Sequence, residues 1–389
     1  MQQVKDVQRA KAKVDDAGYG AAMDGRIDDQ LARGTKEFEL LYLSLNPEGL
    51  AKATNKFRVD ESTSTLYFNG FDAKVYPGDM TKLEAEGVKL KDVVALANSA
   101  PLRKDFKNTA EFAAATTAHI DKIRQGLKPF HKAHQEAYSA MISAMDIPIK
   151  TSGFPAPKLD VATSVEESAQ LRFFRPTDKI TIQEATTMLA NPSVDSPRWV
   201  HKTYYNKNKN QSYNAYVAVD FSGNKTKSDN LPLRRVQGTM YFDPEKKIGD
   251  FNLPEMNNPS RRSEIMRDLL AGKEVKLQTP SPMYPEILMS LNANMATYHV
   301  KNLHGKALGH KEFRTKEAND RLASRISYVD EKGKVTPPKN QPKSGQRQPR
   351  AAASDEEGAR KNKNHRQAAG NSTRVVKKSG QKAGQKVRP

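Results

Sequence analysis

The chain has 389 residues, of which 64 are Lys or Arg and 45 are Asp or Glu, so its formal net charge is +19. It contains no cysteine, which excludes disulfides, thiolate catalysis and every cysteine-ligated metal site. Hydrophobic residues make up 37% of the sequence, against about 45–50% in an ordinary globular chain, so part of the chain is expected to lie outside any core.

The positive charge is concentrated near the end of the sequence. Residues 332–389 hold 16 basic and three acidic residues, a balance of +13, whereas residues 1–331 hold 48 basic and 42 acidic residues, a balance of +6. The final segment is also poor in large apolar side chains, a composition typical of disordered chains. We therefore predict a mildly basic folded body and a disordered basic tail over 328–389.

Targeting and membrane signals are not visible in the sequence. The first residues lack the apolar core of a secretory signal, and no run of apolar residues is long enough for a transmembrane helix. The expectation is a cytoplasmic protein without a membrane partner. At ~150 residues per domain, the length allows about two or three domains.

The first part of the chain is predicted to hold one small α+β unit. Residues 1–25 are charged and rich in alanine, and we expect a frayed or disordered lead-in. The unit spans 26–98, with a short helix that Gly34 ends and a strand from Phe38 to Leu45. Its other strands are expected at 56–59, 65–68 and 71–76, the last two joined by a turn at Asn69-Gly70.

Helices and a linker are predicted next. Apolar spacing over 99–147 indicates a helical hairpin, whose two helices are separated by Gly126 and Pro129. The Pro-rich stretch over 148–170 indicates a linker and a domain boundary.

A second α+β domain is predicted over 171–309. It begins with a strand from Leu171 to Phe174 and a short helix for which Thr181 and Glu184 have the spacing of a capping box. Three strands rich in aromatic and β-branched residues are expected at 199–205, 213–221 and 236–242.

The domain ends in a complete helix-on-sheet unit. A helix that starts at Ser260 is closed by a left-handed cap at Gly272. Strands are expected after it at 274–278, 287–291 and 295–300. A charged helix is predicted over 310–327.

The two units repeat a pattern of helix, glycine and strand. The residues that share this spacing are Ile27, Leu31 and Gly34 in the first unit and Ile265, Leu269 and Gly272 in the second. Residues 43–46 are echoed by residues 289–292. Either the chain contains an internal duplication, or a common local pattern recurs by chance. The predicted class is α+β: two small helix-on-antiparallel-sheet units, an intervening helical hairpin and a disordered basic C-terminal tail.

Catalytic motifs are missing. Signatures of nucleotide-binding, esterase and zinc-protease sites do not occur, so we predict a protein that is not an enzyme and uses no cofactor or metal. His131 and His134 lie three apart on a predicted helix and could bind a metal, but solvated surface histidines have the same spacing. Caps and turns, rather than acid–base catalysis, are the favoured roles of Asp178, Glu184, Asp195 and Asp220.

Tyrosines and lysines surround the predicted turn between the strands at 199–205 and 213–221. Aromatic rings can stack on unpaired bases while lysines contact phosphates, which favours single-stranded nucleic acid. An ordinary polar hairpin, whose tyrosines pack across the strands, explains the same residues. The candidate binding residues, with four arginines that could share their surface, are Tyr204, Tyr205, Lys207, Lys209, Tyr213, Arg234, Arg235, Arg261 and Arg262.

The tail is the strongest functional signal. Its candidate phosphate-binding residues are Arg360, Lys361, Lys363, Arg366, Arg374, Lys377 and Lys378. If about half of the tail's cations contact duplex phosphates, the logarithm of the affinity falls with the logarithm of the salt concentration at a slope of about −7. A tail that only keeps the protein soluble is the alternative.

Three motifs of the second domain occur in a fixed order. They are residues 180–185 (ITIQEA), residues 213–221 (YNAYVAVDF) and residues 290–294 (SLNAN). Together they resemble an uncharacterised group of bacterial proteins associated with conjugative and mobilisable elements, over about residues 171–308 and with an echo at 26–76. The resemblance implies accessory work near DNA and carries over no site residues.

The sequence thus predicts a non-enzymatic accessory protein of a mobile element that binds DNA or RNA through its basic tail. The alternative is a protein–protein scaffold or assembly factor of a mobile element or phage, which would recruit its partner through sheet edges or the helical hairpin.

Overall fold

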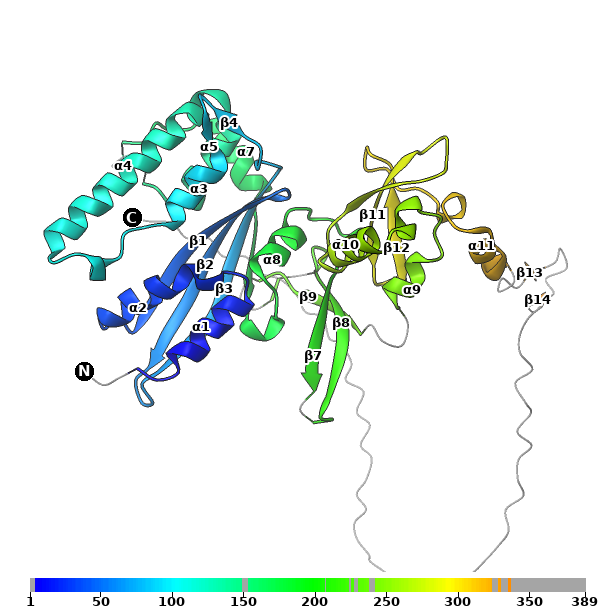
Figure 1. The fold of residues 1–389 in the computed structure, drawn as a ribbon, viewed down its shortest axis with the longest axis horizontal. Helices are drawn as coiled ribbons and strands as arrows, with labels where there is room; N and C mark the ends of the chain where they lie inside the picture. The colour runs from blue at the N-terminus through cyan, green and yellow to red at the C-terminus, as the bar shows by residue number, and fades with distance from the viewer. Residues whose placement is uncertain are drawn as a thin grey trace, which may run out of the picture. The chain divides into compact units, whose positions relative to one another are not determined.

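The computed structural model describes residues 4–148, 153–206, 208–223, 225–226, 230–237 and 242–323, with the backbone alone of 328–329 and 335–336. The chain folds as a mixed α+β protein, which confirms the predicted class (Figure 1). Two short ladders pair β4 (Glu84–Ala85) with β5 (Val88–Lys89) and β13 (Tyr328–Val329) with β14 (Val335–Thr336). Apart from that last pair, the tail predicted over 328–389 lies outside the described residues.

The first sheet has four antiparallel strands in the order β1-β2-β3-β6. They are β1 (Glu37–Asn46), β2 (Gly49–Asp60), β3 (Thr65–Pro77) and β6 (Gln170–Phe174). Successive side chains of a strand point to opposite faces. Both faces here are buried, because Leu40 packs in one hydrophobic core and Leu43 in another. The sheet therefore separates two layers of helices.

The turn predicted at Asn69-Gly70 is wrong, because β3 continues through it. The register with β2 shifts at this point and leaves Asn69 as the extra residue of a β-bulge. Gly70 has a φ of +122°, and an added Cβ would lie 2.2 Å from the carbonyl oxygen of Phe174. The extra residue lets Phe68 and Phe71 face the same core.

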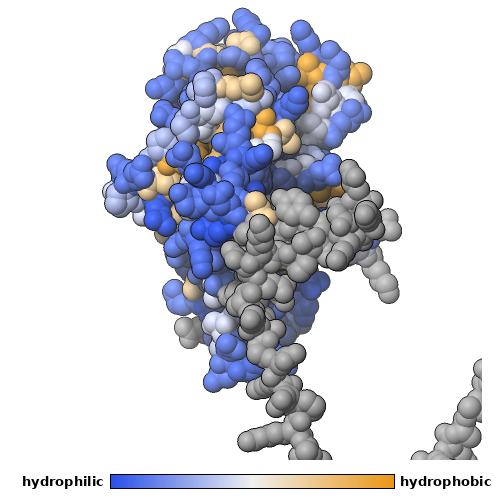
Figure 2. All heavy atoms as spheres, turned by 90° about the vertical axis from the view of Figure 1, so that its right-hand side faces the viewer, coloured by the Kyte–Doolittle hydropathy of each residue, from blue (hydrophilic) through white to orange (hydrophobic). Residues whose placement is uncertain are grey.

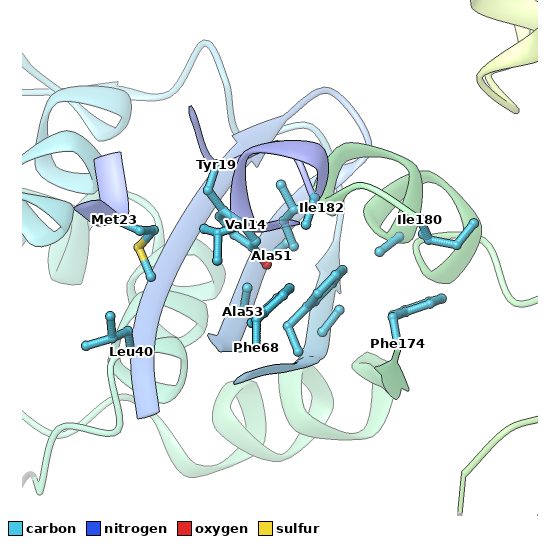
Figure 3. Close-up of a cluster of buried hydrophobic side chains, with 14 of the residues drawn as sticks. Val14, Tyr19, Met23, Leu40, Ala51, Ala53, Phe68, Phe174, Ile180 and Ile182 are labelled. Carbon is cyan, nitrogen blue, oxygen red and sulfur yellow. The ribbon is translucent and has the colours of Figure 1, made fainter. Parts of the chain in front are cut away.

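The first layer of helices covers the sheet face that carries Leu40 (Figure 3). It consists of α1 (Val7–Asp16), the 3-10 turn η1 (Gly20–Met23), α2 (Asp24–Ala32) and α8 (Ile182–Leu189). The lead-in predicted over 1–25 is therefore wrong for its described part, since Ala10, Val14 and Met23 are at most 2% exposed. Small residues among lysines make an apolar stripe too weak to stand out in the sequence.

The second layer of helices packs against the opposite face (Figure 1). Its members are α3 (Leu90–Asn98), α4 (Thr109–Ala133), α5 (Gln135–Ala144) and α7 (Leu159–Ser168). The break predicted between the hairpin helices lies too early, because α4 passes through both Gly126 and Pro129. A proline removes one helical hydrogen bond, but the fully buried side chains of Leu127 and Phe130 hold the helix in place beside it.

The linker and domain boundary predicted over 148–170 are wrong. Residues 159–168 form α7, and Phe154 and Val165 are buried in the second layer. The strand expected to open a second domain is β6, which pairs with β3 and completes the first sheet. Residues 1–337 form one compact unit. A short strand's sequence does not reveal which distant strand it joins, so the prolines alone suggest a boundary where the fold has none.

The second sheet lies between two cores. Its strands, in the order β7-β8-β9, are β7 (Val200–Asn206), β8 (Gln211–Val219) and β9 (Leu233–Gln237). One face contributes Val200, Tyr204 and Val217 to the first core, and the other contributes Tyr216 and Ala218 to a third core. β7 and β8 lie where they were predicted, whereas β9 begins earlier.

The third core belongs to the predicted helix-on-sheet unit, which is confirmed. α10 (Pro259–Leu270) packs on the antiparallel sheet β10 (Val275–Gln278), β11 (Glu286–Asn292) and β12 (Thr297–Lys301). Gly272 has a φ of +83°, as expected for a left-handed cap. An added Cβ there would lie 2.9 Å from Cγ1 of Val200, so this glycine also allows β7 to approach.

The two units share the order of helix, left-handed glycine and antiparallel meander, since Gly34 has a φ of +73°. The predicted match between residues 43–46 and residues 289–292 does not hold in the structure. Residues 43–46 end the first strand of one meander, whereas residues 289–292 end the second strand of the other. The remaining elements are α9 (Pro244–Ile248), α11 (Lys316–Ala323), η2 (Arg103–Asp105), η3 (Pro176–Asp178), η4 (Pro254–Asn257) and η5 (His310–Glu312). The helix predicted over 310–327 is thus split into η5 and α11 within its described part.

The surface is polar over most of the face drawn in Figure 2, which shows small, separate hydrophobic areas among hydrophilic side chains. Of the large apolar side chains that the structure describes, Leu159, Met283 and Met295 are the most exposed, at 82%, 73% and 73%. Among the described helices, none combines the length and apolar character needed to cross a membrane.

Candidate nucleic-acid interface

The predicted tyrosines divide into two that are packed and one that is exposed. Tyr204 is 7% exposed, its hydroxyl donates to the carbonyl oxygen of Asp178 at 2.9 Å, and its ring stacks on Tyr213 with centroids 5.7 Å apart. These two rings pack across β7 and β8, as the hairpin alternative predicted. Tyr205 is 53% exposed, and its hydroxyl donates to Oδ1 of Asn210 at the tip of the hairpin.

Lys209 lies in the turn that joins β7 to β8. Lys209 is exposed, and Lys207 lies outside the described residues. The tail candidates, from Arg360 to Lys378, also lie outside the described residues. Their proposed role therefore stays a prediction.

The predicted arginines are mostly held in ion pairs. Arg235 contacts Oδ1 of Asp178 at 2.8 Å and lies over the Tyr204 ring at 5.0 Å. Arg234 contacts Oδ1 of Asp220 at 2.8 Å, and its hydrogen bond holds the pKa of that carboxyl below its ordinary value. Arg261 and Arg262 lie on α10; Arg261 pairs with Glu264 at 2.6 Å and Arg262 is exposed. The structure thus brings Arg235, Tyr204 and Tyr213 together, and places the α10 arginines on a different element.

Three of the four carboxylates near these strands, Asp178, Glu184 and Asp220, accept hydrogen bonds from nearby backbone amides, as caps and turns do. Asp178 accepts a hydrogen bond from the Arg175 amide at 3.0 Å, and Glu184 accepts one from the Thr181 amide at 2.9 Å in the predicted capping box. Asp220 accepts one from the Ser222 amide at 3.0 Å. Asp195 is exposed.

His131 lies in α4, whereas His134 lies at the break between α4 and α5, so the two are not on one helix as predicted; each faces a backbone carbonyl. Nε2 of His131 lies 3.1 Å from the oxygen of Ala156, and Nε2 of His134 lies 3.3 Å from the oxygen of Glu84. Within the described part of the chain, no three metal-ligating side chains gather at one place.

Four basic side chains that the sequence did not single out together converge on one cavity, which we call the cationic pocket. Its volume is about 540 Å³. It is lined by Lys13, Asp16, Ala17, Phe68, Phe71, Arg175, Pro176, Thr177, Lys179, Ile180 and Lys202. Asp16 is the one acidic side chain among these residues, so the lining carries a net positive charge.

Four separate segments build the cationic pocket. The last turn of α1 and the bulge of β3 form two sides, and the η3 turn and β7 form the others. The end of α1 is fixed because the Ile182 amide of α8 donates to the Ala17 carbonyl oxygen at 2.9 Å. Gly18, with a φ of +91°, permits this approach, since an added Cβ would lie 2.5 Å from Oε1 of Gln183. Figure 3 shows Phe68 and Ile180 reaching the same buried region from different segments.

Two of the four cations are fixed by contacts, and two face the cavity without a carboxylate partner. Lys202 pairs with Glu184, and Lys179 donates to the Thr203 carbonyl oxygen at 2.8 Å. Among the described residues, no acidic side chain lies within ion-pair distance of Lys13 or Arg175. The cavity therefore presents an uncompensated positive charge next to an apolar floor made by Phe68, Phe71 and Ile180.

A buried guanidinium, that of Arg172, lies near the η3 turn and adds to the positive charge around the cationic pocket. Arg172 of β6 is 6% exposed, and its Nε and Nη1 have no hydrogen-bond partner among the described residues. Its Cζ lies 5.1 Å from the centre of the Phe174 ring, which stacks in turn on Phe71. Burial lowers the pKa of Arg172 to about 10, and the neighbouring Arg235 and Arg175 act in the same direction while Asp178 opposes them. The guanidinium is still charged at neutral pH.

Sequence reasoning missed the cationic pocket because its residues are spread from position 13 to position 202. One signal was available: Arg172, Arg175 and Lys179 lie within eight residues at the end of a strand. Comparisons with protein-family models, with curated proteins and with solved structures found no match for this chain.

Proposed function

We propose that this protein is a non-enzymatic accessory protein that binds nucleic acid, with phosphate held in the cationic pocket and the basic tail adding sequence-independent affinity. The observation that carries the proposal is the convergence of Lys13, Arg175, Lys179 and Lys202 on one cavity whose lining includes a single carboxylate. Clustered cations on one surface are the electrostatic footprint of nucleic-acid binding.

The convergence of four cations on one recess strengthens the expected attraction. Charges in a partly enclosed cavity interact through a lower effective dielectric than charges in open water, so the same cations attract a phosphate more strongly there. The cation-bearing side chains also flank Phe68 and Phe71, which are at most 3% exposed and close the apolar side of the cavity.

The tail and the cationic pocket make separable contributions. Four cations predict a salt slope of about −3 on single-stranded nucleic acid, whereas the tail predicts the larger slope of about −7 on a duplex. The tail therefore supplies salt-sensitive affinity, and the cationic pocket supplies a fixed point of attachment.

Fluorescence polarisation with single-stranded DNA, duplex DNA and RNA tests the proposal. The full chain should bind all three, and deletion of residues 338–389, which lie beyond the compact unit, should remove most of the salt dependence. Failure of the full chain to bind any of them at low salt would contradict the proposal.

The scaffold alternative has one observation in its favour. A second cavity of about 640 Å³ lies between β1, α3 and α4 and has a largely apolar lining that includes Phe112, Ile120 and Met145. A protein partner retained by the chain without residues 338–389, together with no nucleic-acid binding by the full chain, would favour this alternative. The mobile-element setting rests on the sequence resemblance over 171–308 alone.

A further inference from the structure

We infer that the cationic pocket takes the end of a nucleic-acid strand, with a terminal phosphomonoester on its cations and the attached nucleotide at its open side. The inference rests on the proposed function and specifies which part of a nucleic acid the cationic pocket recognises. Its carrying observation is that the site is a partly open recess between four segments, lined by four cations and one carboxylate.

The shape of the cationic pocket favours a chain end. Its volume of about 540 Å³ falls within the ~300–1,000 Å³ range of small-ligand sites. α1, the β3 bulge, η3 and β7 stand around it, so a nucleotide that enters has walls on several sides. An internal phosphodiester would bring a neighbouring nucleotide on each side, and both would have to be accommodated at the open side of the recess. A terminal nucleotide has one such neighbour.

The charge of the cationic pocket favours a monoester over a diester. A terminal phosphate carries about −1.5 to −2 charges at pH 7, whereas each internal phosphate carries one. Lys13 and Arg175 lack an acidic partner among the described residues, so the additional charge of a monoester meets cations that no carboxylate neutralises. Arg175 can also bind two phosphate oxygens at once, a geometry that an unsubstituted terminal phosphate presents most fully.

The backbone that carries two of the cations is held in place before any ligand arrives. The η3 turn that precedes Lys179 and follows Arg175 is fixed through Asp178, which accepts the Arg175 amide, pairs with Arg235 and has its carbonyl bound by the Tyr204 hydroxyl. Binding therefore has little backbone to order at this turn, and its remaining cost is to order the exposed Arg175 side chain. The packed Tyr204 thus acts by holding the turn, rather than by stacking on a base.

Competition binding with the full chain tests the inference. The probes are one single-stranded oligonucleotide with a 5′-phosphate, the same strand with a 3′-phosphate, and the same strand with hydroxyls at both ends. We expect one phosphorylated form to bind about tenfold more tightly than the hydroxyl form, the effect of about one added charge-assisted hydrogen bond. The variant Lys13→Ala/Arg175→Ala should lose this preference and keep its affinity for the hydroxyl form within about threefold.

Matched controls separate the possible failures. Lys91→Ala/Lys311→Ala removes the same charge from exposed positions on other elements and should keep the preference. Lys13→Gln/Arg175→Gln, with circular dichroism and thermal unfolding like those of the wild type, excludes misfolding as the cause of a loss. Equal binding of all three probes by the wild type would overturn the inference and leave the proposed function standing. Absence of binding to every probe would overturn both.

Discussion

Asn98 binds both backbone groups of Leu43: the Leu43 amide donates to Oδ1 of Asn98, and Nδ2 of Asn98 donates to the Leu43 carbonyl oxygen, each at 2.8 Å. Leu43 lies in β1, at one edge of the first sheet. Asn230 makes the same pair of bonds with Phe173 of β6, at the other edge, each at 3.0 Å. A side-chain amide thus takes the place of a neighbouring strand at one point on each edge. Such caps protect a sheet from edge-to-edge association.

Asn98→Ala is therefore expected to destabilise the protein and to promote self-association. Two hydrogen bonds are lost and two backbone groups are left without partners, which corresponds to about 1–3 kcal/mol in the free energy of unfolding. Urea unfolding measures the first effect, and size-exclusion chromatography at increasing concentration measures the second. Asn294→Ala, at an exposed position of a hairpin turn, is the control. An unchanged urea midpoint for Asn98→Ala would show that the amide does not cap the edge in solution.

Two glycines with nearly the same backbone conformation should tolerate alanine differently. Gly272 has a φ of +83° and packs against Val200, whereas Gly305 has a φ of +80° and has open space around it. Gly305→Ala should cost only the strain of a left-handed residue, about 1–2 kcal/mol. Gly272→Ala should cost more, because its Cβ would also collide with β7.

Thermal or urea unfolding of both variants measures the difference. Since the left-handed strain is common to both, the excess for Gly272→Ala reports the close packing between α10 and β7. Equal destabilisation of the two would mean that β7 does not pack against this cap as described.

Arg172→Met is expected to separate stability from binding. The buried guanidinium leaves two nitrogens without partners, and replacement of an incompletely paired buried charge by an apolar side chain of similar volume is often neutral or stabilising. We expect the free energy of unfolding to fall by no more than about 1 kcal/mol, and the affinity for a phosphorylated strand to fall about twofold to threefold, because one nearby positive charge is lost. Urea unfolding and polarisation on the same samples test this. A loss of stability above about 3 kcal/mol would instead show that Arg172 is well paired in the folded protein.

Acid should destabilise the protein before its carboxylates are protonated. Burial lowers the pKa of His299 to about 4, and the nearby Lys301 and Arg198 act in the same direction. Between about pH 6.5 and pH 4 the unfolded chain therefore binds a proton that the folded chain does not, so stability falls as the pH falls through this window. Burial also lowers the pKa of His310, His201 and His119.

Urea midpoints measured from pH 7.5 to pH 4 check this pH dependence. His299→Gln should flatten the curve, whereas His304→Gln, at an exposed turn position, should leave it unchanged. A wild-type midpoint that stays constant from pH 6.5 to pH 4 would contradict the assignment.

Local sequence rules identified the elements whose form depends on nearby residues. The Thr181 and Glu184 capping box and the Gly272 cap are both confirmed, because each needs only a few adjacent residues to form. The same rules placed the unit of α10 and its sheet correctly. A confirmed cap says nothing, however, about which other element the helix will contact.

Features that depend on distant partners were missed. Asn69-Gly70 has turn chemistry, but pairing with β2 and the close approach of Phe174 make it a bulge. α1 has only small apolar residues, and its burial is decided by the sheet beneath it. The cationic pocket depends on both features, because it lies where the end of α1 meets the bulge of β3. Only the meeting of segments remote in sequence creates it.

Salt dependence of binding is the most direct test of phosphate recognition in the cationic pocket. Polarisation with a single-stranded oligonucleotide that carries a terminal phosphate, measured for the full chain from low to physiological salt, gives the slope of log affinity against log salt. We predict that Lys13→Ala/Arg175→Ala reduces the magnitude of this slope by about 1 to 2, since each lost phosphate contact removes about 0.7. Lys91→Ala/Lys311→Ala should leave the slope unchanged. Identical slopes for the wild type and the Lys13→Ala/Arg175→Ala variant would contradict the account.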